Sequence, residues 1–362
     1  MEPGPSTRSI HAGVPEGDQG TPLLPGPVLA APYHLRGAAD SADYGYGRDG
    51  NPSWTHLERA LGELDGGETV VFGSGMAAVT AVLMTSLRAG DVLVACGDGY
   101  PGIRGLAADR LEPLGVETRL VPSDTAALAA AAEGAALVWL ETPSNPKLDV
   151  VDIAAVSGAA HAAGAAVAVD NTVATPLGQR PLALGADAAM LSGTKSLSGH
   201  SDVLLGAVSV TDPDRAAELR RWRTQSGSIL GGFEAWLAHR SLATLGLRLE
   251  RSTANAAAVA ALLRARDDVT GVVLPQGPVA DRQMAFAGPL CGFALETAER
   301  AQAFLSACRL VTEATSFGGV HSTAERRGRW GTDDVPDGFV RFSAGCEDTP
   351  DLVADVEQAL DA

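Results

Sequence analysis

The chain has 362 residues, which is more than one ordinary hydrophobic core needs and suits two domains. Hydrophobic residues make up 46% of it and charged residues 20%, a globular composition rather than that of a disordered chain. With 44 acidic against 27 basic side chains the net charge is −17, which argues against binding to nucleic acid or to anionic membranes.

Strand-like and helix-like segments alternate between about residues 69 and 169. The fifty residues at the start are rich in Gly and Pro and predict an extended arm. A β-branched run at 69–72 and strand-like segments at 91–95 and 116–121 then predict strands, as do short apolar runs at 135–140 and 165–169. Helical patterns lie between them at 75–87, 102–114 and 151–163. This alternation, with uninterrupted apolar strands, predicts an α/β fold with a mostly parallel sheet covered by helices.

The pattern changes after about residue 245. A long helix is predicted at 247–266, then separate strands at 269–274, 291–295 and 339–343, and a final helix at 350–360. These segments predict a smaller α+β domain. We therefore expect an arm at 1–50, a large domain at 51–245 and a small C-terminal domain at 246–362.

The cysteines and histidines show no metal-binding or disulfide pattern. The four cysteines lie far apart and form no C-x-x-C pair, which excludes a zinc-ribbon spacing and gives no sign of a disulfide-stapled secreted domain. The seven histidines have no metal-ligand spacing, so we expect no metal. The first residues do not resemble a signal peptide, and no run is apolar enough to span a bilayer. We expect a soluble, cytoplasmic protein.

Lys195 follows an apolar, strand-like stretch and two hydroxyl residues, Ser192 and Thr194. A buried ammonium group is costly unless its charge is used or lost. A lysine with a depressed pKa can attack an aldehyde and hold a cofactor covalently, and the two hydroxyls can bind that cofactor's phosphate. A surface lysine in a Ser/Gly turn explains the stretch 191–196 about equally well. It is not a P-loop, because no Gly precedes the lysine directly.

A Gly-rich turn, 73–75, joins a predicted strand to a predicted helix. Free backbone N–H groups at a helix start can hold a phosphate. The spacing Gly73-x-Gly75-x-x-Ala78 also fits a dinucleotide fingerprint, with Asp91 or Asp98 near the expected ribose-binding position. An NAD-binding oxidoreductase, any enzyme with a phosphorylated cofactor, and a plain strand-to-helix turn therefore remain open here.

Three more polar positions follow or interrupt apolar strands. Asp170 ends the strand at 165–169, where open α/β sheets bind ligands; it can keep a pyridine nitrogen protonated or simply cap the next turn. Asn145 offers a donor and an acceptor in a loop that two prolines make rigid. Arg341 interrupts the strand at 339–343 and can clamp a carboxylate or form a structural ion pair.

Taken together and in this order, these residues resemble the trans-sulfuration (Cys/Met metabolism) family of enzymes that depend on pyridoxal phosphate (PLP). The resemblance runs nearly end to end. The matching stretches are Thr7–Gly13, Tyr46-x-Arg48-x-x-Asn51–Pro52, Ser74–Met76, Tyr100, Glu141–Pro146, Asp170–Thr172, Ser192-x-Thr194–Lys195, Gly199–Asp202, Ser316–Gly319 and Arg341–Asp348. The resemblance implies PLP fold type I (aspartate aminotransferase-like) and PLP as the cofactor.

The resemblance also implies a role for each matching residue. Lys195 would hold PLP covalently and move protons on the substrate, and Tyr100 would stack on the ring and assist. Asp170 would pair with the pyridine nitrogen and Asn145 with the ring hydroxyl. The implied phosphate-binding residues are Gly75, Met76, Ser192 and Thr194, joined by Tyr46 and Arg48 from a neighbouring subunit. Arg341 and the Ser316 backbone would hold the substrate α-carboxylate. A homotetramer, built as a dimer of dimers, is implied as well.

Three departures from the family pattern bear on the substrate. Gly102 stands where methionine γ-lyases carry Cys, and His321 stands where many members have Glu. Residues 324–330 replace a stretch that contains His-Pro in many relatives. We expect this segment, with His321, to line the distal end of the substrate pocket; its 325–330 part is most similar to bacterial γ-lyases.

The expected activity is that of a PLP-dependent carbon–sulfur lyase of the cystathionine γ-lyase kind. It would convert L-cystathionine to L-cysteine, 2-oxobutyrate and ammonia by γ-elimination. The alternatives are γ-replacement on an O-acylhomoserine, as in cystathionine γ-synthase or homoserine sulfhydrylase, and methionine γ-lyase activity. A cofactor-binding relative without useful activity is a further alternative.

Overall fold

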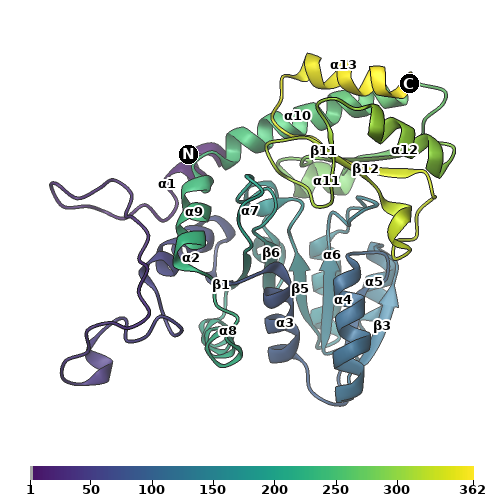
Figure 1. The fold of residues 1–362 in the computed structure, drawn as a ribbon. Helices are drawn as coiled ribbons and strands as arrows, with labels where there is room; N and C mark the ends of the chain where they lie inside the picture. Colours follow the sequence, from purple (N-terminus) through teal and green to yellow (C-terminus); the bar gives the residue numbers. More distant parts are fainter. Residues whose placement is uncertain (1–2) are drawn as a thin grey trace.

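The protein is described by a computed structural model that covers residues 3–362 (Figure 1). The larger of two sheets has seven strands, which lie in the order β1 (Glu68–Phe72), β7 (Gly206–Val210), β6 (Ala188–Ser192), β5 (Ala166–Asp170), β4 (Leu137–Glu141), β2 (Val92–Cys96) and β3 (Glu117–Val121). Neighbours from β6 to β3 run parallel, whereas β7 is antiparallel to both β6 and β1. The predicted α/β fold with a mostly parallel sheet is confirmed.

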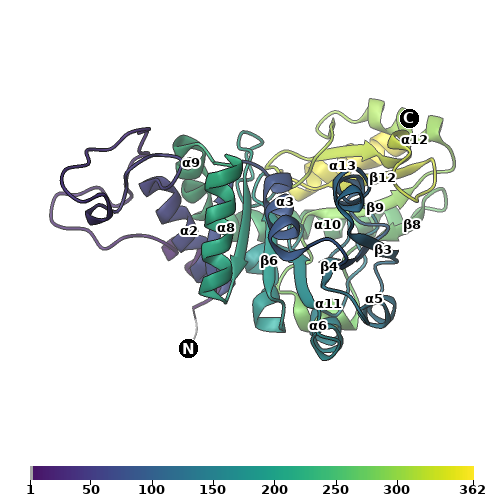
Figure 2. The same ribbon diagram turned by 90° about the horizontal axis from the view of Figure 1, so that it is seen from below.

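Helices cover both faces of this sheet (Figure 2). Successive side chains of a strand point to opposite faces, so a strand that is apolar at every position presents apolar side chains on both faces. One face packs against α3 (Gly75–Ser86), α4 (Pro101–Leu106) and α8 (Pro213–Ser226). The other face packs against α5 (Thr125–Ala131), α6 (Ile153–Ala162), α2 (Pro52–Asp65) and α9 (Gly232–Leu242). The central strands β2, β4 and β5 are covered on both faces and are therefore apolar almost throughout, whereas the edge strand β3 keeps polar, partly exposed residues.

The smaller sheet has five strands, in the order β10 (Thr312–Glu313), β11 (Thr323–Arg326), β12 (Phe339–Ser343), β9 (Leu290–Ala294) and β8 (Thr270–Val273). It packs against α10 (Leu245–Arg264), α12 (Ala298–Ala307) and α13 (Thr349–Leu360). The first turns of α10 join the core of the large sheet, and its later turns join the core of the small one. The expected domain boundaries at residues 50 and 245 stay predictions.

The predicted helix at 102–114 is interrupted. After α4 the chain forms a π-turn at Ala107–Leu111 and a 3₁₀ turn at Glu112–Leu114. Pro113 has no backbone N–H to continue the α-helical pattern, which accounts for the change near the end. Short helices α7 (Thr175–Gly178) and α11 (Pro278–Gln283) and 3₁₀ turns at Pro181–Leu184 and Arg327–Trp330 complete these two parts.

The N-terminal arm contains more structure than the sequence predicted. A short helix, α1 (Pro5–His11), starts with Pro at its first position and packs against α10. After α1 the arm forms a 3₁₀ turn at Ala39–Ser41 and an isolated β-bridge between Pro32 and Tyr46, and it extends away from the two sheets in Figure 1. Leu23 and Leu29 are 86% and 76% exposed there. Within residues 3–362, the structure has no helix with the length and apolarity needed to cross a bilayer.

Candidate active site

A cavity of about 330 Å³ lies where the C-terminal ends of β4, β5 and β6 meet the start of α3. The small sheet closes one side of it with Arg341 of β12 and the loop that carries Ser316. Ligands of open α/β sheets bind at this edge of the strands. Ten of the thirteen site residues predicted from the sequence line the cavity, and the exceptions are Tyr46, Arg48 and His321.

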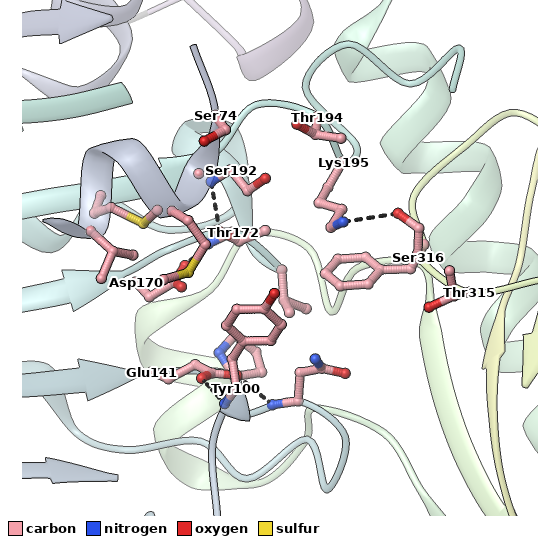
Figure 3. Close-up of a pocket in the computed structure, with 18 of the residues that line it drawn as sticks. Ser74, Tyr100, Glu141, Asp170, Thr172, Ser192, Thr194, Lys195, Thr315 and Ser316 are labelled. Atoms are coloured by element: carbon pink, nitrogen blue, oxygen red, sulfur yellow. Dashed lines mark hydrogen bonds between the residues drawn. The ribbon is translucent and has the colours of Figure 1, made fainter. Parts of the chain in front are cut away.

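Lys195 is half-buried and points into the cavity (Figure 3). Its Nζ donates a hydrogen bond to Ser316 Oγ at 2.8 Å and lies 5.4 Å from the centre of the Phe317 ring. Burial and the charge of Arg341 lower the pKa of Lys195, and the charge of Asp170 opposes them only in part. More of this amine is therefore neutral than in an exposed lysine, and the neutral amine is the form that attacks an aldehyde or takes a proton.

Asp170 is buried at the end of β5, and its Oδ1 accepts a hydrogen bond from Thr172 N at 2.9 Å. It stands opposite Glu141 of β4 in the parallel register. Burial raises the pKa of Asp170, against the hydrogen bonds from Thr172 and the charge of Lys195. The ionised form of such a buried carboxylate is stabilised most by a cationic partner, for example a protonated pyridine nitrogen.

Glu141 is a site residue that the sequence analysis treated only as part of a rigid loop. Its Oε2 accepts from the backbone N of Tyr100 at 2.5 Å, and its Oε1 accepts from the backbone N of Asn145 at 2.7 Å (Figure 3). Burial, and then the charge of Asp170, raise the pKa of Glu141 to about 8. One side chain thus fixes the two loops that carry Tyr100 and Asn145. A charged residue at the end of a buried strand was the available signal.

The start of α3 lies beside the end of β6 at the cavity wall. The first N–H groups of a helix have no intrahelical acceptor, and here they belong to Gly75 and Met76 at the cavity wall. A Cβ at Gly75 would lie 2.8 Å from Ser192 Cβ, so only Gly allows this close approach. The Thr194 hydroxyl also lines the cavity, although it already accepts from Leu205 N at 3.0 Å. These residues fit a phosphorylated cofactor.

Arg341 is buried in β12 and reaches the cavity from the small sheet. Its Nη1 donates to Asn145 Oδ1 at 2.8 Å, and its Nη2 donates to the Ser316 carbonyl at 2.7 Å. Burial, and then the charge of Arg327, lower the pKa of Arg341 to about 10, so it remains a cation at neutral pH. It is the guanidinium group best placed to bind a substrate carboxylate.

Three predicted residues lie outside this cavity. Tyr46 and Arg48 are in the arm, where Arg48 stacks over the Tyr46 ring at 5.5 Å and donates to the Thr224 carbonyl at 3.2 Å. His321 is exposed and lines a second hollow, of about 390 Å³, which shares Thr194 and Ser316 with the first. Their assigned roles stay predictions.

The segment 324–330 lies differently from the expectation that it lines the distal pocket. Of its residues only Arg327 lines the main cavity. Glu325 is completely buried behind Arg341, and Trp330 is 52% exposed. Among the described residues, no cluster of three or more His, Cys, Asp or Glu side chains could hold a metal ion.

The fold and the cavity together define an α/β enzyme that uses a lysine, a buried carboxylate and the N–H groups at the start of a helix. A sequence model of the Cys/Met metabolism PLP-dependent enzymes matches residues 6–361. The chain belongs to this family. The predicted PLP cofactor, the enzyme class and a reaction on sulfur-containing amino acids are thereby confirmed, and the dinucleotide interpretation of Gly73–Ala78 is set aside.

Three proteins illustrate the similarity. A Streptomyces coelicolor protein named "Putative cystathionine gamma-lyase" is 54% identical, over 99% of this chain and 94% of its own length. Cystathionine γ-synthase of Mycobacterium tuberculosis is 37% identical, over 99% and 97%. The crystal structure of apo CalE6, a methionine γ-lyase from Micromonospora echinospora, has a TM-score of 0.92 and 38% identity, and covers 98% of both chains.

Proposed function

We propose that the protein cleaves L-cystathionine by γ-elimination to L-cysteine, 2-oxobutyrate and ammonia. The observation that carries the proposal is the convergence of Lys195, Asp170 and Arg341 on one cavity. An amine of lowered pKa, a buried carboxylate and a buried guanidinium are what proton removal from an amino acid requires. The 54% identity to the Streptomyces protein named as a cystathionine γ-lyase supports elimination.

The residues present fit PLP, which when bound supplies an electron sink for negative charge at the substrate's carbon atoms. Lys195 would hold the cofactor aldehyde, and Asp170 would hold the pyridine nitrogen in its protonated form. Asn145 would bond the ring hydroxyl. The phosphate would be held by the α3 residues Gly75 and Met76 and by the hydroxyls of Ser192 and Thr194.

The chain's own side chains would then handle the substrate and its protons. Arg341 and the Ser316 backbone bind the α-carboxylate and so orient the Cα–H bond. Lys195, as a neutral amine, takes the α-proton and returns protons later. Tyr100, which borders the same cavity, assists these transfers. Elimination then requires removal of a second proton, at Cβ, before the sulfur leaves from Cγ.

Gly102 argues against methionine as the preferred substrate. The Tyr100 ring lies against Gly102 so closely that a Cβ there would be 2.4 Å from Tyr100 Cε1 and 2.9 Å from Met76 Sδ. A cysteine at this position, the pattern of methionine γ-lyases, would displace the ring. The observed position of the Tyr100 ring therefore requires Gly at residue 102.

Product analysis tests the proposed reaction. The purified enzyme is given L-cystathionine alone, and separately L-cysteine with O-acetyl- or O-succinylhomoserine. We expect 2-oxobutyrate and cysteine from the first mixture, at a kcat/KM at least about tenfold above that for L-methionine. A thioether formed from the second mixture without keto acid would identify γ-replacement as the reaction.

The proposal includes an active site shared between subunits of a homotetramer. Tyr46 and Arg48 lie in an arm that extends from the rest of the chain, and their basic and phenolic groups suit a phosphate on a second copy. The acidic net charge supports an enzyme without nucleic-acid or anionic-membrane partners, and we propose that it works in the cytoplasm.

Mixed subunits test the shared site. Arg48→Ala and Lys195→Ala are each expected to be inactive as pure proteins, the first through weakened cofactor binding. When the two variants are co-expressed, half of the random dimers contain one intact site, so about a quarter of the wild-type activity should return. Activity of the mixture no higher than that of the separate variants would show that each site belongs to one chain.

A further inference from the structure

Glu325 is a completely buried carboxylate directly behind the substrate-facing Arg341. The two residues are opposite each other in the antiparallel pairing of β11 with β12. Glu325 Oε2 accepts from Arg341 Nη2 at 3.0 Å and from Arg327 Nη1 at 2.9 Å. Its Oε1 accepts from Arg329 Nη2 at 2.9 Å and from Trp330 Nε1 at 2.8 Å. Each of these hydrogen bonds is thus donated by a cationic side chain or by the indole.

The buried charges continue as an alternating series, Asp333–Arg327–Glu325–Arg341. Asp333 Oδ2 lies 2.7 Å from Arg327 Nε and 2.7 Å from Arg327 Nη2, and both side chains are almost fully buried. Burial acts to raise the pKa of Glu325, but the hydrogen bonds from Trp330 and Arg327 and the charge of Arg341 outweigh it and hold that pKa below its ordinary value. Buried charges are tolerated only when they are paired in this way.

This series determines where the Arg341 guanidinium can lie. On the cavity side it is held by Asn145 Oδ1 and the Ser316 carbonyl, both of them neutral acceptors. On the far side Glu325 supplies the only anionic oxygen that the described structure places on it. Because Arg327 and Arg341 share Glu325 Oε2, loss of this charge would leave two buried cations facing each other.

We propose that Glu325 is a positioning residue, which fixes Arg341 so that the substrate must present an α-carboxylate, and that Asp333 and Arg327 fix Glu325 in turn. This inference rests on the role of Arg341 in the proposed function. It differs from the expectation that residues 324–330 line the distal pocket, because Glu325 acts from behind Arg341 without touching the substrate.

The test compares two small ligands that differ only by a carboxylate, L-alanine and ethylamine. Their dissociation constants are measured on the holoenzyme from the change in cofactor absorbance. We expect Glu325→Gln to raise the dissociation constant of alanine roughly tenfold or more, which is the contribution of a charge-assisted hydrogen bond. The dissociation constant of ethylamine should change less than about twofold. Glu325→Asp, which keeps the charge, should recover part of the loss for alanine.

Glu313→Gln is the matched control. Glu313 bonds the same Arg329 at 2.9 Å on its outer side and does not contact Arg341. It should leave both dissociation constants unchanged. The measurement needs no cystathionine turnover, so it holds even if the physiological substrate is another amino acid.

Two results would overturn the inference. Unchanged or tighter alanine binding in Glu325→Gln would mean that Glu325 competes with the substrate for Arg341 instead of positioning it. Equally weakened binding of alanine and ethylamine would mean that the substitution disrupts the whole pocket and not the position of Arg341. If Glu325→Gln does not fold, Asp333→Asn serves instead: it leaves Arg341 and Glu325 in place, and should weaken alanine in the same direction by a smaller factor.

Discussion

Lys195→Ala is expected to lower kcat at least about 10³-fold and to leave the fold intact. The amine is the one group in the cavity with both the reach and the lowered pKa to hold an aldehyde and to move the substrate's protons. Its removal deletes a single side-chain hydrogen bond, to Ser316 Oγ, and relieves the burial of a cation. Steady-state rates and melting temperatures of wild type and variant check both parts.

The chain contains a second lysine, Lys147, which makes the control direct. Lys147 is paired with Asp334 at 3.1 Å and does not line the cavity. Borohydride fixes PLP to the lysine that holds it, so mass spectrometry should find the label on Lys195 in the wild type and in Lys147→Ala. No labelled peptide should appear in Lys195→Ala. Label on Lys147, or full turnover by Lys195→Ala, would contradict the assignment.

Most strands of the large sheet were predictable, because most of them are covered on both faces, whereas the strand β7 at Gly206–Val210 was not predicted. A run such as 165–169 must then be apolar at every position, and β5 occupies Ala166–Asp170. Strand order was not predictable, because it depends on pairing between distant segments. The pattern at 206–210 does not say that β7 inserts antiparallel between β1 and β6.

The cavity residues were predictable where each one follows a strand. Asp170 and Lys195 stand out because a charged residue next to an apolar run needs a reason to be there. Glu325 and Asp333 gave no such signal. They lie in a segment dense in charged residues, which is typical of an exposed surface, and their burial depends on arginines brought together by the fold.

The sequence predicted that the arm is extended. It did not predict the helix α1 at the start of the arm or which residues of the arm are exposed. Helix α1 depends on packing against α10, more than two hundred residues away in the sequence, and Ser6 lies where a Cβ at Gly246 would be. A local pattern of Gly and Pro carries no information about such a contact. The exposure of Leu23 and Leu29 could not be predicted either, because apolar side chains are ordinarily expected to be buried.

Asp170→Asn is expected to lower kcat about 10²–10³-fold, the effect of removing a preorganised charge from an active site. Asn keeps the size of the side chain and can still accept the hydrogen bond from Thr172 N. It cannot supply the negative charge that keeps a pyridine nitrogen protonated. Asp187→Asn is the matched control. Asp187 precedes β6, at the end of the strands opposite to the cavity, and its Oδ2 accepts a hydrogen bond from Val167 N at 2.7 Å. That variant should retain its kcat.

Stability should change in the opposite direction to activity. Burial raises the pKa of Asp170, so ionising this group destabilises the folded chain at pH values above its ordinary pKa. In the cofactor-free protein, Asp170→Asn should therefore melt no lower than the wild type at neutral pH. The difference should shrink on acidification, as the wild-type carboxyl becomes protonated in both the folded and unfolded states. A lower melting temperature at neutral pH would show that Asp170 stabilises the fold, and a retained kcat would remove it from the reaction.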